Sequence, residues 1–334
     1  MQLLISGGRS RNNSQQMEEW HRSEAAIVTL IDTDTGTGEV VIKYQSPPDV
    51  CPNETPSVLF KSGALHEDRL YACTQTEVIV YQLPNFEIVN YISLPFFNDL
   101  HHVTPDGQGG LLVTVTGLDM VVRLDMDGNI MDEWSVLPDV ELWSRFSRKI
   151  DYRKIATTKP HAAHPNYTFL NKNDVWTTRL EQKDAICLTS EKPSMKIDVE
   201  RPHDGILYDE GVYFTTIDGH VVCCDLDTGE KLRTINLSEI FDANRPLGWC
   251  RGLLPVGNDC FIIGFTRLRS TKYKENVKWV KDQIKKNILR KKYNPSWALP
   301  SRISCVDLTN RKIVWEIDLE QFNMNEVFSI YRLN

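Results

Sequence analysis

Short runs of alternating apolar and polar residues recur along the chain and are separated by turns rich in Asp and Gly. The clearest group spans 201–237, RPHDGILYDEGVYFTTIDGHVVCCDLDTGEKLRTINL, where acidic residues and glycines interrupt four such runs. Alternation with a period of two is typical of strands, and Asp-Gly pairs favour tight hairpin turns. This segment therefore predicts a sheet of four antiparallel strands.

The same unit recurs about every 40–45 residues, a spacing typical of propeller blades. Further copies span 56–95, 98–138, 164–200 and, split by an insertion, 248–320. Three N-terminal fragments (MQLLISGG, AAIVTLIDTDTG and GEVVIKYQ) and one C-terminal fragment (EVFSIYRL) supply four more strands. We predict an all-β fold: residues 1–334 form a single six-bladed β-propeller, closed by pairing the two ends of the chain, with the C-terminal strand innermost. A β-sandwich joined to a helical domain is the alternative.

Two long insertions, 139–160 and 268–302, fall in connections that emerge where the innermost strands begin. The second contains an amphipathic helical pattern around 272–293, and residues 272–292 include nine basic residues and two acidic ones. Such a helix either packs on the rim with a solvated basic face or binds a protein partner or an anionic membrane surface. We expect both insertions to shape a lid over the channel mouth.

Composition narrows the class of partner and the compartment. A net charge of −7 argues against nucleic acid, whose binding proteins usually carry a basic face. No apolar run reaches the roughly 18 residues that a transmembrane helix needs, and the N-terminus lacks the pattern of a secretory signal. The eight cysteines show no CxxC pair and no framework spacing, which is typical of a cytoplasmic protein with reduced thiols.

Aligning the blades on the apolar residue that opens each second strand identifies one equivalent position near the start of each innermost strand. His203 lies nine residues before Val212, and Glu326 is the candidate in the closing blade, where the chain break prevents counting. The six positions are Lys61, His102, Asn166, His203, Arg251 and Glu326. Because innermost strands line the channel, these side chains are predicted to converge at one mouth. A solvated polar ring without activity is the alternative.

One chemistry for this ring is a divalent metal site. His102 and His203 supply imidazole ligands, and Asn166 or Glu326 adds an oxygen ligand, a set that suits Mn, Fe or Zn, with Ca as a further candidate. His161 and His164, in the segment KPHAAHPN, lie in a loop at the same mouth, so that either is a substitute ligand. His101 is expected to point to the strand face opposite His102.

The other chemistry is acid–base catalysis on a small anion. Arg251 and Lys61 hold a carboxylate, phosphate or sulfate, with Asn166 and Arg267 as further substrate-binding residues. His203 or His102 then acts as general acid or base, with Glu326 opposite.

Three segments resemble the motifs of the bacterial domain-of-unknown-function 4915 family: LGWCRGLLPVGNDCFIIGFTRLR, ERPHDGILYDEGVYF and ISCVDLTNRKIVWEIDLEQFNMNEVFSI. The matching positions are His203, Arg251, Gly252, Leu253, Gly264, Arg267 or Arg269, and Glu326, with His102 as a further family histidine. The resemblance covers mainly the C-terminal 140 residues. It implies a propeller-like fold and supports these positions as a set, and it implies no activity.

We therefore predict an enzyme that acts on a small anionic metabolite at the channel mouth, as a metal-assisted hydrolase, lyase or isomerase. The alternatives are a non-catalytic propeller that binds a ligand or protein partner through the same face, and a module that docks on a membrane or polyanion through its basic helix. The sequence contains no GxSxG, HExxH, P-loop or dinucleotide fingerprint that would specify the reaction.

Overall fold

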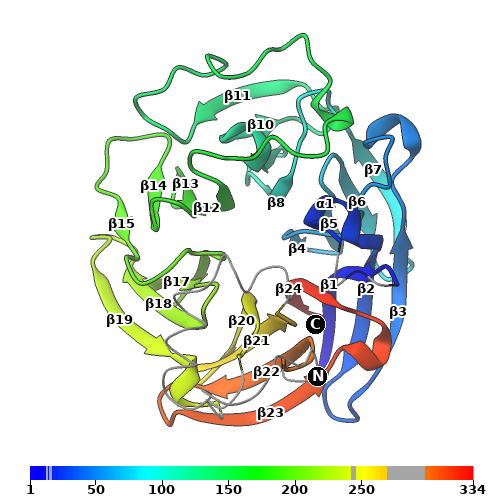
Figure 1. Ribbon diagram of the computed structural model, residues 1–334. Helices are drawn as coiled ribbons and strands as arrows, with labels where there is room; N and C mark the ends of the chain where they lie inside the picture. Colours follow the sequence, from blue (N-terminus) through cyan, green and yellow to red (C-terminus); the bar gives the residue numbers. More distant parts are fainter. Residues whose placement is uncertain (13, 15–16, 242–245, 269–297, 334) are drawn as a thin grey trace, which may run out of the picture.

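The computed structural model describes residues 1–333 except 13, 15–16, 242–245 and 269–297. The described residues form six antiparallel sheets of four strands each, arranged around a common axis (Figure 1). The prediction of a six-bladed β-propeller is confirmed. The predicted helix around 272–293, and with it a partner surface on 272–292, lies outside the described residues.

Each blade is a simple meander whose innermost strand faces the axis. The closing blade contains β24 (Glu326–Arg332), β1 (Gln2–Ser10), β2 (Ser23–Asp32) and β3 (Thr37–Tyr44). The next two contain β4 (Ala64–His66), β5 (Arg69–Cys73), β6 (Val78–Gln82) and β7 (Glu87–Ile92), then β8 (Leu100–Pro105), β9 (Leu111–Val115), β10 (Met120–Leu124) and β11 (Ile130–Ser135). The fourth contains β12 (Pro165–Asn171), β13 (Asp174–Arg179), β14 (Asp184–Cys187) and β15 (Met195–Lys196). The last two contain β16 (Ile206–Tyr208), β17 (Gly211–Thr215), β18 (His220–Asp225) and β19 (Lys231–Asn236), then β20 (Trp249–Gly257), β21 (Cys260–Thr266), β22 (Arg302–Asp307) and β23 (Lys312–Asp318).

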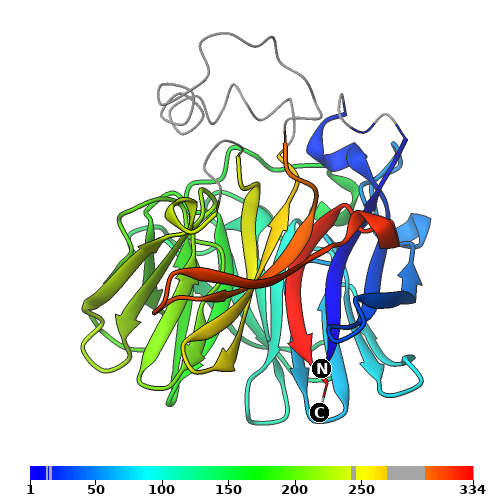
Figure 2. The ribbon, with the colours of Figure 1, turned by 90° about the horizontal axis from the view of Figure 1, so that it is seen from below.

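The two ends of the chain close the ring as predicted. β24 pairs with β1 from Leu3 opposite Arg332 to Gly8 opposite Glu326. The N- and C-termini lie together at one end of the molecule (Figure 2), so that Glu326, at the start of β24, marks the opposite end. A β-carbon on Gly7 would lie 1.8 Å from the carbonyl oxygen of Glu326, and this close approach requires glycine.

The hydrophobic core is distributed between neighbouring blades. One cluster joins Val80 and Val78 of β6 to Val113 and Leu111 of β9, and another joins Ile262 of β21 to strands of the closing blade. Each blade packs against a neighbouring blade on both faces. Its second and third strands therefore carry apolar residues on both faces and are almost continuously apolar in sequence. The described blades therefore share their core with their neighbours and do not enclose one central core.

Several innermost strands carry a β-bulge close to the mouth. The register shifts between Leu100 and His102 in β8, between Pro165 and Thr168 in β12, and between Cys250 and Leu253 in β20. β24 carries one extra residue, Phe328, opposite the step from Ser6 to Gly7. A bulge breaks the alternation of side chains and turns the residues around it to new directions.

The described helical segments are short, and α1 (Glu19–Arg22) is the only α-helix among them. The 3₁₀ turns are η2 (Pro48–Val50), η3 (Thr116–Leu118), η4 (Tyr152–Lys154), η5 (Leu237–Glu239) and η8 (Glu320–Phe322). Within the part of the chain that the structure describes, no helix has the length and apolar character to cross a membrane.

Candidate functional site

A cavity of about 490 Å³ opens at the mouth where the innermost strands begin. Four histidines and two arginines are among the residues that line it: His101, His161, His164, His203, Arg201 and Arg251. A second, narrow cavity of about 40 Å³ is lined by Lys61, Asp99, Glu326 and Phe328, among others. Glu19 of α1 and Lys159 of the insertion 139–160 line both cavities and form an ion pair of 3.1 Å. The first insertion therefore contributes to the wall of the mouth.

Two of the predicted ring residues, Lys61 and Arg251, meet on one aromatic ring. The Lys61 ammonium lies 5.0 Å from the centre of the Phe328 ring, and the Arg251 guanidinium carbon lies 4.2 Å from it. All three side chains are buried. His203 approaches the same ring edge-on, with centroids 6.0 Å apart. The bulged residue of β24 thus supports both cations through cation–π contacts.

Asp99 provides a negative charge beside Lys61 and His101. Its carboxylate lies 3.4 Å from the Lys61 ammonium and 3.7 Å from Nδ1 of His101. Burial alone would raise the pKa of Asp99, but Lys61, His101, Lys159 and His161 lower it, and the net pKa lies well below the ordinary value. Asp99 is therefore ionised at neutral pH.

His101 and His203 are neutral imidazoles in this environment. Nδ1 of His101 donates a hydrogen bond of 2.9 Å to the carbonyl oxygen of Asp99, which leaves the lone pair on Nε2. Burial and then Lys61 lower the pKa of His101 to about 3. Burial, followed by Arg251 and His101, holds the pKa of His203 well below its usual range. The two rings lie 6.2 Å apart.

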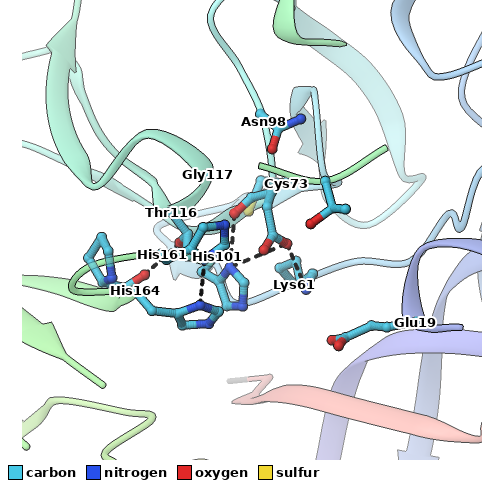
Figure 3. Close-up of polar contacts among 12 residues, drawn as sticks. Glu19, Lys61, Cys73, Asn98, His101, Thr116, Gly117, His161 and His164 are labelled. Atoms are coloured by element: carbon cyan, nitrogen blue, oxygen red, sulfur yellow. Dashed lines mark hydrogen bonds and ion pairs between the residues drawn. The ribbon is translucent and has the colours of Figure 1, made fainter. Parts of the chain in front are cut away.

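His161 and His164 complete the group of histidines (Figure 3). Their Nδ1 atoms lie 2.7 Å apart, and the ring of His164 meets that of His101 edge-on at 4.9 Å. Burial lowers the pKa of both, and His101 and His161 lower that of His164 further. Figure 3 shows the three rings gathered on one side, with Lys61 beyond them.

The structure corrects the prediction for His102. Its buried ring lies 3.7 Å from the ring of Tyr167, stacked between two blades, and its Nδ1 accepts a hydrogen bond from the backbone N–H of Thr168. Burial lowers its pKa to about 3. The bulge in β8 adds His101 to the strand, so that His101 and not His102 reaches the mouth cavity.

Three other predicted residues serve the frame around the cavity. Asn166 is fully buried and donates 2.9 Å to the carbonyl oxygen of Pro202 in the next blade. Glu326 lies 3.4 Å from the Arg22 guanidinium of α1, in an ion pair with both side chains buried. Arg267 binds both carboxylate oxygens of Glu320 at 2.7 Å, apart from the residues that line the mouth. Of the predicted ring, Lys61, His203 and Arg251 come together with His101 and Asp99, and Glu326 lines the narrow cavity together with Lys61.

Fold and site together define a six-bladed β-propeller in which neutral histidines and the charged side chains of Lys61, Asp99 and Arg251 lie together at one channel mouth. Solved structures of similar fold include a protein of unknown function from Bacteroides caccae, which is 15% identical over 98% of this chain and 97% of that chain, with a TM-score of 0.60. A chain of the nidogen/laminin complex is 9% identical, with 99% and 97% covered and a TM-score of 0.55. A streptogramin B lyase is 12% identical, with 97% and 90% covered and a TM-score of 0.51. At these identities the likeness shows the fold alone.

No family model matches this chain, and no curated protein matches it. The resemblance to the domain-of-unknown-function 4915 family stays a prediction.

Proposed function

We propose that the protein is an enzyme that binds a small anionic molecule at the channel mouth and moves a proton on it, as hydrolases, lyases and isomerases do. The observation that supports this proposal is the burial of Lys61 and Arg251 against the ring of Phe328, in a site that also holds the neutral imidazoles of His101 and His203. Burying two cations is costly, and a ring that only lined a wet channel would leave them solvated.

Anion binding would use the two cations in different ways. The guanidinium of Arg251 offers a planar fork that fits a carboxylate or phosphate, whereas the ammonium of Lys61 acts as a compact charge. Asp99 balances Lys61 at 3.4 Å. Arg251 lines the 490 Å³ cavity and so faces the space where a small molecule fits.

His203 would act as the general base that accepts the proton. Its ring lines the 490 Å³ cavity together with Arg251, so that it can contact a molecule bound there. Burial and the charge of Arg251 keep the imidazole neutral, so that it can accept a proton. An anion bound to Arg251 would offset that charge and raise the pKa of His203 toward neutrality, where a general base works best.

The proposal is tested by incubating the wild-type protein and the variants His203→Gln and Arg251→Gln with mixtures of small carboxylates and phosphate esters. Mass spectrometry follows the loss of each compound, and calorimetry measures the binding of any compound that is consumed. We expect His203→Gln to bind the compound with little change but to turn it over about 100-fold more slowly. Arg251→Gln should weaken binding about 10-fold or more.

Arg311→Gln is the matched control because Arg311 is exposed on the rim and pairs with Glu239. It should bind and turn over the compound as the wild type does. Binding without turnover in the wild type would instead identify a non-catalytic propeller that uses the same cavity. Equal turnover by wild type and His203→Gln would rule out the assigned proton transfer.

A further inference from the structure

Asp99, His161 and His164 form a group whose potential ligand atoms all lie within 4.8 Å of one another. All three are partly buried. The two histidines line the 490 Å³ cavity, and Asp99 lines the adjoining one. A carboxylate and two imidazoles at this spacing are the ligand types that zinc, iron and manganese use in proteins.

The hydrogen bonds of His161 fix which of its nitrogens carries the proton. Nε2 lies 3.2 Å from the hydroxyl oxygen of Thr158. The single hydroxyl proton of Thr158 is already engaged by acceptors, the carbonyl oxygen of Gly117 at 2.5 Å and the side-chain oxygen of Asn98 at 3.3 Å. His161 must therefore donate from Nε2, which leaves a lone pair on Nδ1. Histidines that bind metals commonly donate their other N–H to an oxygen in this way.

The lone pair on Nδ1 of His161 faces Nδ1 of His164 at 2.7 Å. Without an ion, one proton on His164 bridges the two nitrogens. Two imidazole nitrogens that bind one ion at about 2.1 Å lie about 3.0–3.4 Å apart, for ligand angles of about 90–110°. Transfer of that proton from Nδ1 to Nε2 of His164, which keeps the ring neutral, and an opening of a few tenths of an ångström would turn the pair into two ligands.

Hydrogen bonds to Asp119 fix the backbone of the loop that carries His161 and His164. His164 has φ of +54°, a left-handed conformation that is uncommon for residues with a β-carbon. The buried carboxylate of Asp119 accepts hydrogen bonds from the backbone N–H groups of Ala162, Ala163 and His164 at 2.8, 3.0 and 2.8 Å. Strained conformations fixed by such contacts occur preferentially at functional sites.

We propose that Asp99, His161 and His164 bind one divalent transition-metal ion at the wall of the mouth cavity. The inference rests on the proposed function in one respect, since it names a cofactor for that site. Zinc, iron(II) and manganese(II) fit a ligand set of two imidazoles and one carboxylate, and calcium does not, because it prefers oxygen ligands. Three protein ligands leave coordination positions for water or for a bound anion.

The test uses the full chain stripped of metal with a chelator and titrated with Co²⁺, whose visible absorption reports imidazole ligation. Zn²⁺ then competes for the same site. We expect one Co²⁺ per chain, and an affinity at least 100-fold lower in His161→Ala and in Asp99→Asn. His220→Ala is the matched control, because His220 also pairs with a carboxylate, Asp218, at 2.9 Å, and stands outside the group. Circular dichroism verifies that each variant is folded.

Absence of Co²⁺ binding in the folded wild type, or equal binding in His161→Ala, would overturn the metal site. Anion binding is measured separately on metal-free protein, with Arg251→Gln as its control. Binding of the anion without Co²⁺ binding would reject the metal and leave the proposed function intact. Co²⁺ binding without any anion binding would support the metal and count against the proposed function.

Discussion

Asp119 is the most informative single residue to change, because one buried carboxylate holds the loop that presents two histidines to the mouth. Its Oδ1 accepts the backbone N–H groups of Ala163 and His164, and its Oδ2 accepts that of Ala162 and the guanidinium of Arg145. Asp119→Asn keeps the shape of the side chain but replaces one oxygen with an NH₂ group. In either orientation of the amide, its oxygen keeps two of the four hydrogen bonds. Its NH₂ group then faces the other two N–H donors, which lose their acceptor.

The structure sets the size of the effect. A hydrogen bond to a charged group contributes about 1.5–3 kcal/mol, so that two lost bonds correspond to about 3–6 kcal/mol if nothing relaxes. Water can reach Ala162, which is exposed, and Arg145, whose side chain is 35% exposed, and it compensates part of the loss. We therefore expect Asp119→Asn to lower the free energy of unfolding by about 2–3 kcal/mol.

Urea denaturation measures this loss, and Co²⁺ titration of the same variant should show weaker binding because the loop of His161 and His164 is less well held. Asp125→Asn is the matched control: Asp125 also accepts backbone N–H groups, those of Asp127 and Asn129, but in an exposed turn. It should change neither measurement appreciably. If Asp119→Asn unfolded at the wild-type urea concentration and bound Co²⁺ as tightly, Asp119 would not position the loop.

Three further predictions concern other parts of the frame. Burial raises the pKa of Asp204 to about 6, so that this carboxyl favours the folded state while protonated and loses that contribution as pH rises from about 4 to 6. Asp204→Asn should accordingly gain stability relative to the wild type between pH 4.5 and pH 7.5, by about 2 kcal/mol, and equal urea midpoint differences at the two pH values would contradict this. Gly7→Ala should destabilise the ring closure by about 3 kcal/mol or more, because its β-carbon would meet a carbonyl oxygen at 1.8 Å. Thermal melting should show a smaller loss, of about 1 kcal/mol, for Gly107→Ala, where no atom lies within 4 Å and only the φ of +71° is unfavourable for alanine. Thr158→Val removes the acceptor of the His161 N–H and should weaken Co²⁺ binding about 10- to 100-fold without a matching loss of stability; an unchanged affinity would argue against that role.

The fold could be predicted from the sequence because its signal is local and repeated. Alternating apolar positions and Asp-Gly turns mark each strand, and the incomplete ends are complementary. The pairing of β24 with β1 followed from counting strands, since an open array would leave unpaired edges. Counting nine residues back from the start of the second strand also located Lys61 and His203 at equivalent positions. Each donates its backbone N–H to the carbonyl oxygen of the last residue of the second strand of its blade, Cys73 and Thr215 respectively.

The same count predicted that His102 lies at the mouth, which is wrong because the count is valid only for strands without bulges. One extra residue in β8 brings His101 to the cavity, and no composition signal in LHHVTP distinguishes the two histidines. Asp99 was missed because it lies in the turn before β8, with φ of +48°, outside the positions that the repeat compares. Asp119 could not have been found by spacing, because it contacts a loop more than 40 residues further along the chain.

The bulges explain how a repeated fold acquires a site that no single repeat contains. In the regular part of each blade, alternation directs apolar side chains into the space between blades, so those positions are committed to the core. His101, Arg251 and Phe328 lie at or beside bulges, where the chain has one residue more than its partner strand and a side chain can turn toward the mouth. A hydrogen bond of 3.0 Å from the backbone N–H of Gly252 to the carboxylate of Asp204 stabilises the bulge at Arg251. Substitutions of His101 and Arg251 should therefore alter binding at the mouth more than stability, whereas substitutions in the regular strands should do the reverse.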